Sequence, residues 1–259
     1  MRIRELAAWG LDQDEYRPAA YRGDLEIARA LAATRAPFEP SSALVESGDC
    51  GLREQFAEQE ARADLQAEMA GLDWFLGVVD LRLLLAFQRR IILDSGAPVP
   101  DPNDWVGRMD LCFGKPEPIV CDAIRSDSSV VFRSVNPNLH FRFTGDSSNP
   151  IALHSGSPFF EVAQYRGRWF LRDGYHRAFR CLQAGVSHLP AVIVRARTIE
   201  ELGAAHPWFF PEALIFSAIP PRLIDFLNDA LVIEYPRSPL RKTLRITVEE
   251  TYTLGGKNL

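Results

Sequence analysis

The chain has 259 residues, 47% of them hydrophobic and 24% charged, which is typical of a globular protein with a substantial core. Its formal net charge of -5 argues against a surface built wholly for nucleic acid, so DNA is not the expected partner. The 4 cysteines lack C-x-x-C spacing and the N-terminus lacks the apolar segment of an export signal, so we expect a cytoplasmic chain with reduced thiols and no membrane partner.

The first 71 residues are expected to form a mostly helical N-terminal extension. Residues 24–36 carry apolar side chains at helical spacing, and the segment PFEPSS then ends the pattern. Residues 52–71 are rich in Glu, Gln, Ala and Arg with few large apolar side chains, which favours a largely solvated helix.

A strand followed by a helix is predicted next. Residues 74–81, W-F-L-G-V-V-D-L, have the aromatic and β-branched composition of a buried strand. Residues 82–94 have helical length, so we expect a first βα unit here. Prolines at positions 98, 100 and 102 then predict a loop.

The middle of the chain is expected to be rich in strands. Residues 118–124, 129–135 and 140–143 are three candidates separated by turn residues. Residues 159–165 and 168–172 predict a hairpin whose turn is Arg166 and Gly167. A short helix from Tyr175, capped by Gly185, and a buried strand over residues 188–196 complete a mixed α/β pattern.

The C-terminal segment, residues 199–259, is expected to contain a helix over residues 222–232 and a strand over residues 240–254. Trp208, Phe209 and Phe210 lie between two prolines. They indicate either the packing of a loop against the core or a surface for a partner or a stacked base.

The corner at Asp173 and Gly174 has an unusual distribution of charge. Gly174 permits a positive φ or the close approach of a ligand. The basic residues His176, Arg177 and Arg180 follow at the helix N-terminus, where the helix dipole favours anions, so we expect something negative there. Two explanations are open. In the first, Asp173 caps the helix and Arg177 pairs with it or with another carboxylate; in the second, an external anion binds the backbone N–H groups and the arginine.

The motif D-G-Y-H-R-A, followed by a glycine and a buried strand, resembles the ParB/sulfiredoxin-like superfamily, in which this corner binds nucleotide phosphates. The resemblance covers residues 158–196 and extends back to Trp74. It implies a ParB/sulfiredoxin-like core over residues 72–198, with a helical extension (1–71) before it and an α+β extension (199–259) after it. It also implies a nucleotide-binding set made of Asp173, Gly174, His176, Arg177 and Arg180.

The ligand that this resemblance implies is a nucleoside di- or triphosphate with Mg²⁺. Asp80 and Glu161 are candidate catalytic carboxylates for phosphotransfer or nucleotide hydrolysis, although each also fits an ordinary strand-end or surface carboxylate. No histidine spacing indicates a metal site made of protein ligands alone. The acceptor substrate is not identified.

Three function classes therefore remain after the motif is considered. The first is a nucleotide-binding protein, with or without phosphotransferase or hydrolase activity. The second is a non-catalytic regulatory or interaction protein with this fold, and the third is a DNA-processing or DNA-binding protein. Tyr175 stands where sulfiredoxin has its reactive cysteine, so sulfinic-acid chemistry is not expected, and no helix-turn-helix pattern follows Ala196.

Overall fold

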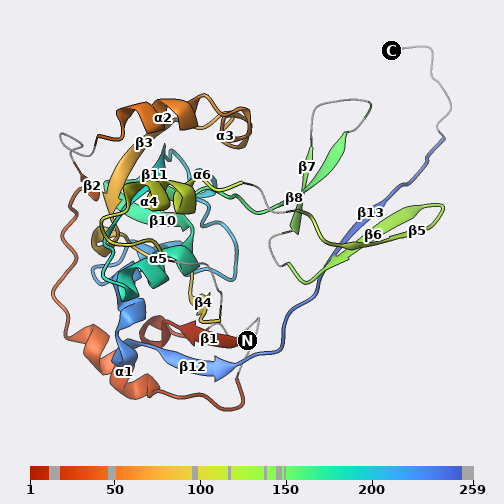
Figure 1. Cartoon of the computed structure of the whole chain (residues 1–259). Helices are drawn as coiled ribbons and strands as arrows, with labels where there is room; N and C mark the ends of the chain where they lie inside the picture. Colours follow the sequence, from red (N-terminus) through yellow and green to blue (C-terminus); the bar gives the residue numbers. More distant parts are fainter. Residues whose placement is uncertain are drawn as a thin grey trace, which may run out of the picture. The chain divides into compact units, whose positions relative to one another are not determined.

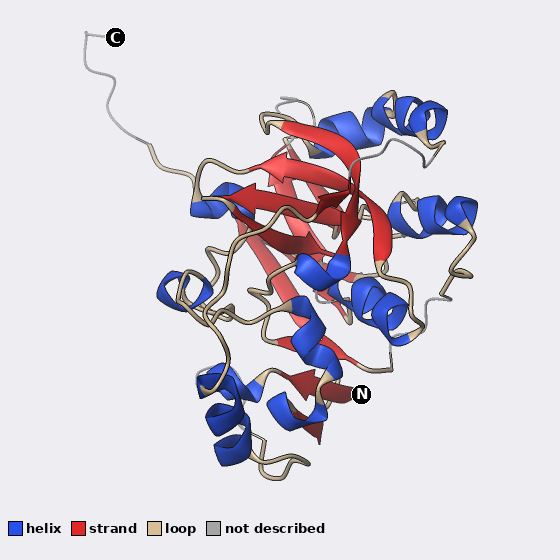
Figure 2. Cartoon of the chain, turned by 90° about the vertical axis from the view of Figure 1, so that its left-hand side faces the viewer, coloured by secondary structure: helices blue, strands red, loops and turns tan. Residues whose placement is uncertain are grey.

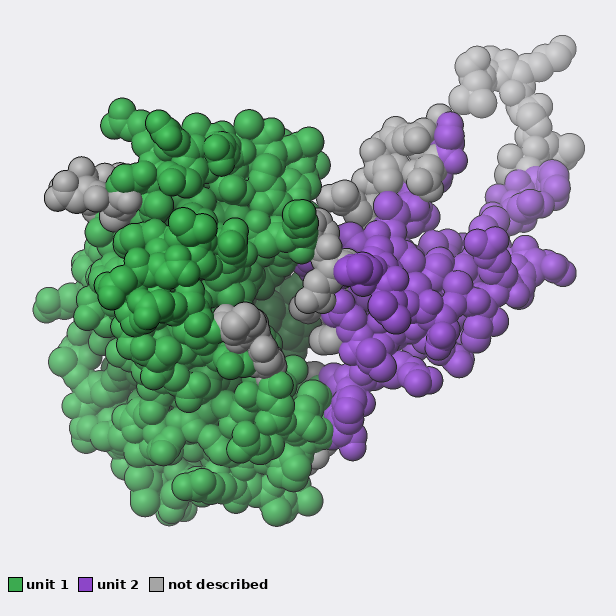
Figure 3. All heavy atoms as spheres, viewed as in Figure 1, with its two compact units in different colours: residues 1–115, 157–237 green, residues 116–156, 238–259 purple. Residues whose placement is uncertain are grey.

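The computed structural model describes residues 1–11, 18–45, 51–94, 99–115, 118–136, 139–143, 148 and 150–252. The chain forms two compact units, residues 1–115 with 157–237 and residues 116–156 with 238–259 (Figures 1 and 3). Each unit is thus built from two separate stretches of chain. These boundaries differ from the segments 1–71, 72–198 and 199–259, which stay a prediction based on resemblance.

The larger unit is organised around a five-stranded sheet with strand order β10-β9-β11-β3-β2. Its strands are β2 (Leu44–Val45), β3 (Trp74–Asp80), β9 (Glu161–Tyr165), β10 (Arg168–Asp173) and β11 (His188–Arg195). β9 and β11 are parallel, and the other neighbours are antiparallel. The predicted strand at 74–81, the hairpin and the strand at 188–196 are confirmed. Central β11 is buried along residues 189–194, because both of its faces are covered.

The α-helices among the described residues all belong to the larger unit and are drawn in blue in Figure 2. They are α1 (Leu25–Ala33), α2 (Arg53–Glu60), α3 (Ala63–Glu68), α4 (Trp105–Cys112), α5 (Tyr175–Gln183), α6 (Ile199–Leu202) and α7 (Glu212–Ile215). The predicted helix at residues 24–36 is confirmed as α1, and its N-cap Asp24 accepts hydrogen bonds from two backbone N–H groups. The helix expected over residues 52–71 is divided into α2 and α3. None of the helices in the described residues is long and apolar enough to cross a membrane.

The helix predicted over residues 82–94 is wrong. The chain makes one 3-10 turn (Leu81–Leu83), continues in extended form and ends in the short strand β4 (Arg90–Ile92). Leu85 donates its N–H to Trp169 O and accepts from Leu171 N, while Ala86 donates to Pro221 O. The extended segment therefore lies between β10 and the segment near Pro221. The consecutive residues Leu84, Leu85 and Ala86 are all fully buried, which a helix with one buried face would not achieve.

A second small sheet in the same unit has the order β12-β1-β4 and joins β1 (Arg2–Glu5) to β12 (Ile233–Pro236). The buried carboxylate of Glu5 accepts hydrogen bonds from Tyr235 Oη at 2.6 Å and Arg90 Nε at 3.0 Å. The helix predicted over residues 222–232 is confirmed only in part, because this segment forms two short 3-10 helices, Leu223–Leu227 and Asp229–Leu231, and not one continuous α-helix.

The smaller unit consists of strands only within the described residues. β5 (Asp122–Arg125), β6 (Ser129–Ser134) and β13 (Lys242–Thr247) form an antiparallel sheet in the order β13-β6-β5. β7 (Leu139–Phe143) pairs with β8 (Ile151–Ser155), a strand that the sequence did not indicate. The strands predicted over residues 129–135 and 140–143 are confirmed as β6 and β7. Those predicted over residues 118–124 and 240–254 are confirmed only in part, as β5 and β13, and residues 253–254 lie outside the described part of the chain. The chain as a whole is a mixed α/β protein.

Candidate functional site

The corner between β10 and α5 is shaped by Gly174. This residue is the N-cap of α5 and has a φ of +99°, a conformation that favours glycine. A Cβ at this position would lie 2.5 Å from Cδ2 of Phe160. The backbone conformation and the Phe160 ring thus account for the glycine without a ligand. Asp173 accepts a hydrogen bond from Gly174 N and does not cap the helix, so the capping explanation is wrong.

The guanidinium of Arg177 binds backbone carbonyl groups. It donates to Pro158 O and Phe159 O, each at 2.7 Å, and to Leu111 O at 3.1 Å. Leu111 lies in the last turn of α4, where the carbonyl groups carry the negative end of the helix dipole. These carbonyl oxygens place partial negative charge beside Arg177. The sequence analysis predicted negative charge here but assigned it to Asp173 or to a bound anion.

Two carboxyl groups lie side by side across the hairpin. Glu161 of β9 pairs with Asp173 of β10, next to a bulge in the strand register, and we call them the carboxyl pair. Glu161 is 2% exposed and forms an ion pair with Arg172, while its Oε1 has no hydrogen-bond partner in the described part of the chain. Burial and the neighbouring charge of Glu161 raise the pKa of Asp173 to about 6, against the opposing effect of Arg177.

His176 lies in the first turn of α5. Its Nε2 is buried and has no partner among the described residues. Burial, together with the charge of Arg177, lowers the pKa of His176, so the imidazole is neutral at neutral pH. Gly174 offers no side-chain cap to the helix, and the first backbone N–H groups of α5 therefore remain without an intrahelical partner. Arg180 lies one turn further along the same helix.

Asp80 is remote from the carboxyl pair. It ends β3 opposite His188, whereas Glu161 pairs with Val192, four residues or about 13 Å further along β11. Asp80 forms an ion pair with Arg82 at 2.6 Å and lies 3.8 Å from Nε2 of His188. Burial acts to raise the pKa of Asp80, but the hydrogen bonds and charge of Arg82 lower it overall. The two carboxylates predicted to be catalytic are thus not brought together.

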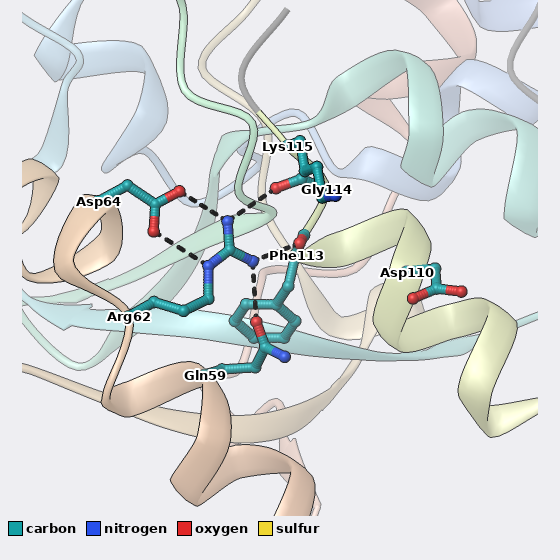
Figure 4. A pocket seen from close by; sticks show the side chains of 7 residues that line it. All are labelled: Gln59, Arg62, Asp64, Asp110, Phe113, Gly114 and Lys115. Atoms are coloured by element: carbon teal, nitrogen blue, oxygen red, sulfur yellow. Dashed lines mark hydrogen bonds and ion pairs between the residues drawn. The ribbon is translucent and has the colours of Figure 1, made fainter.

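The sequence analysis did not identify Arg62, which lines a pocket of about 630 Å³ (Figure 4). Its guanidinium donates to both carboxylate oxygens of Asp64, to Gln59 Oε1 and to the carbonyl groups of Phe113 and Gly114. All five of its N–H donors are therefore used. Arg62 and Arg177 thus both donate hydrogen bonds to carbonyl groups at the C-terminal end of α4.

The geometry gives little support to a metal site made of protein ligands alone or to a cysteine nucleophile. The described residues contain no cluster of three or more His, Cys, Asp or Glu side chains able to hold a metal ion. Burial raises the pKa of the thiols of Cys112 and Cys181, which makes them poor nucleophiles.

Comparison of the chain with protein-family models, with curated proteins and with solved structures found no match. The resemblance to the ParB/sulfiredoxin-like superfamily therefore rests on the D-G-Y-H-R-A motif and its strand context.

Proposed function

We propose that the chain binds the phosphates of a nucleotide at the start of α5 and uses the carboxyl pair for proton transfer during phosphoryl transfer or hydrolysis. The observation that supports this most directly is that the first backbone N–H groups of α5, which have no side-chain cap, directly follow a pair of carboxyl groups, buried Glu161 and partly buried Asp173. His176 and the N-terminal backbone of α5 keep the binding role expected for them. Arg177 takes a different role, because its donors already hold backbone carbonyl groups.

The phosphate-binding part of the proposal follows from helix geometry. The first N–H groups of a helix point outward along its axis and carry positive partial charge, so they attract phosphate oxygens. In α5 the nearby residues 175–177 supply these groups, and the N-cap Gly174 has no side-chain oxygen to compete for them. The unpaired Nε2 of His176 is a further polar group in the same turn.

The catalytic part follows from the protonation of the carboxyl pair. A carboxyl group with a pKa of about 6, as Asp173 has, can exchange a proton near neutral pH. Mg²⁺ usually binds one or two protein carboxylates together with substrate phosphates, and the free Oε1 of Glu161 with Asp173 fits this donor set. When bound, Mg²⁺ would neutralise phosphate charge.

Calorimetric titration with ATP, ADP, CTP and GTP, with and without Mg²⁺, tests the binding. His176→Pro removes one first-turn N–H that has no intrahelical partner, whereas the matched control His176→Ala keeps it. We expect binding to wild type, a loss of about tenfold or more in His176→Pro and a smaller loss in His176→Ala. Glu161→Gln and Asp173→Asn should bind nucleotide without turning it over. Absence of binding to folded wild-type protein would refute the proposal.

A non-catalytic regulatory or interaction protein is the second candidate. The three carbonyl groups bound by Arg177 and the contact between Gly174 and Phe160 favour it, because they explain the motif as a structural corner. Tight nucleotide binding without turnover in wild type would support a sensor of this class.

A further inference from the structure

A second pocket, of about 460 Å³, lies in the larger unit between α6 and the start of α7. Its wall includes His206, Phe209 and Phe210, with Arg89 and Glu200 among the charged lining residues. We call it the aromatic pocket. Its volume is within the usual range for small-molecule sites.

The aromatic wall is held in a fixed geometry. The ring of His206 stacks on that of Trp208 with centroids 4.4 Å apart and planes 7° apart. Phe209 meets His206 nearly edge-on at 5.8 Å. Arg89 lies 4.4 Å from the ring centroid of Phe210 and donates to Phe209 O at 3.3 Å, which fixes the backbone of this wall. Flat rings presented in this way suit a planar, π-rich ligand.

One charged group of the pocket is open to a ligand. The side chain of Glu212 is paired with Arg166, but the exposed carboxylate of Glu200 has no partner within the described residues. A carboxylate accepts hydrogen bonds and donates none, so it selects a ligand that carries N–H groups. The exocyclic amino groups of adenine, guanine and cytosine meet this requirement. Uracil offers only its N3–H, which lies between two carbonyl oxygens that repel a carboxylate.

The aromatic pocket is also joined to the carboxyl pair. Arg172 forms an ion pair with Glu161 and donates its Nε–H to Glu201 O, next to Glu200, at 3.1 Å. Phe87 provides a second connection, since its ring centroid lies 4.9 Å from that of Phe209 and 5.9 Å from that of Tyr175, the first residue of α5. Arg172 and Phe87 therefore each contact residues beside both the pocket and the corner.

We infer that the aromatic pocket binds an amino-bearing nucleobase, with Glu200 accepting from the amino group and the aromatic wall contacting the ring. The inference rests on the proposed nucleotide-binding function for the identity of its ligand. The pocket supplies the base site of the nucleotide, and the start of α5 supplies the phosphate site.

Calorimetric titration with nucleosides tests the pocket separately from the phosphate site, because nucleosides carry no phosphate. Adenosine, guanosine, cytidine and uridine are compared with inorganic tripolyphosphate, which probes the α5 corner alone. At least one amino-bearing nucleoside should bind about fivefold or more tightly than uridine, and Glu200→Ala, which removes the acceptor, should remove that preference. His206→Ala should weaken nucleoside binding. His154→Ala is the matched control, because it removes a histidine stacked on His140 in the smaller unit, and should change nothing.

The two proposals fail in different ways. Nucleoside binding without tripolyphosphate binding would support the aromatic pocket and contradict the phosphate site at α5. Tripolyphosphate binding without nucleoside binding would overturn the inference and leave the phosphate site standing. Nucleoside binding that is equal for uridine, or that survives His206→Ala unchanged, would also overturn the inference.

Discussion

Replacing Gly174 with alanine should destabilise the larger unit more than an ordinary glycine replacement does. A non-glycine residue in the left-handed region costs about 1–2 kcal/mol, and Gly174 has a φ of +99°. The new methyl group would also lie 2.5 Å from Phe160 Cδ2, in a core where overpacking costs about 1–3 kcal/mol. Together these terms predict a loss of about 2–5 kcal/mol in the free energy of unfolding.

Gly167→Ala provides the matched control. Gly167 has a φ of +73°, but no atom lies within 4 Å of the position its Cβ would take. This variant should therefore lose only the backbone cost of about 1–2 kcal/mol. Urea denaturation of both variants is followed by circular dichroism. If the dependence of the unfolding free energy on urea concentration is the same for both, the difference between their unfolding free energies isolates the contribution of the Phe160 contact.

Adding Phe160→Leu to both glycine variants makes the test stricter. The smaller side chain should relieve the collision, so that the cost of Gly174→Ala falls toward that of Gly167→Ala. Equal losses for the two single variants in the wild-type background would refute the argument that Phe160 selects glycine at this corner.

Three further changes test the surroundings of the corner. Asp173 has its pKa raised by folding, so the stability it contributes is present at low pH and lost as the pH rises toward about 6. Unfolding titrations at several pH values should show that Asp173→Asn gains stability relative to wild type as the pH rises from 4 to 7, by up to about 3 kcal/mol. A difference in unfolding free energy between the two proteins that does not change with pH would contradict this. Tyr175→Phe should cost about 2–4 kcal/mol in urea unfolding, because the buried hydroxyl serves two backbone N–H groups and one carbonyl; a loss below about 1 kcal/mol would count against that role. Arg62→Gln should lower the free energy of unfolding by about 2–4 kcal/mol, measured by thermal denaturation. The control Arg82→Gln, at a more exposed arginine, should lower it by at most about 1 kcal/mol. Similar losses for the two variants would contradict the role of Arg62 in holding α4.

Elements with a strong local pattern were predictable from the sequence. The β9–β10 hairpin has turn residues at Arg166 and Gly167 between two apolar runs, and α5 has its apolar positions on one face. The segment over residues 82–94 was not predictable, because leucine-rich runs fit a buried helix and a buried extended chain equally well. Its conformation depends on hydrogen bonds to Trp169 and Pro221, which lie far away in the sequence.

The candidate site was predictable in its location but not in its contacts. The motif located the corner, and the conflict between Arg177 and the helix dipole indicated that negative charge lies nearby. Backbone carbonyl groups supply that charge, and any residue type can supply a carbonyl, so the sequence carries no sign of Leu111 or Pro158 as partners. The neighbouring carboxyl group of Glu161 became evident only from the strand register.

The way the two units share the chain has a consequence for folding during synthesis. β6 belongs to an insertion between α4 and β9, yet its partner β13 begins only at Lys242, and β1 pairs with β12, which begins at Ile233. Closing such long loops is entropically costly and slows the formation of native pairs. A nascent chain must therefore keep the edges of β1 and β6 from pairing elsewhere until residues 233–247 have emerged from the ribosome.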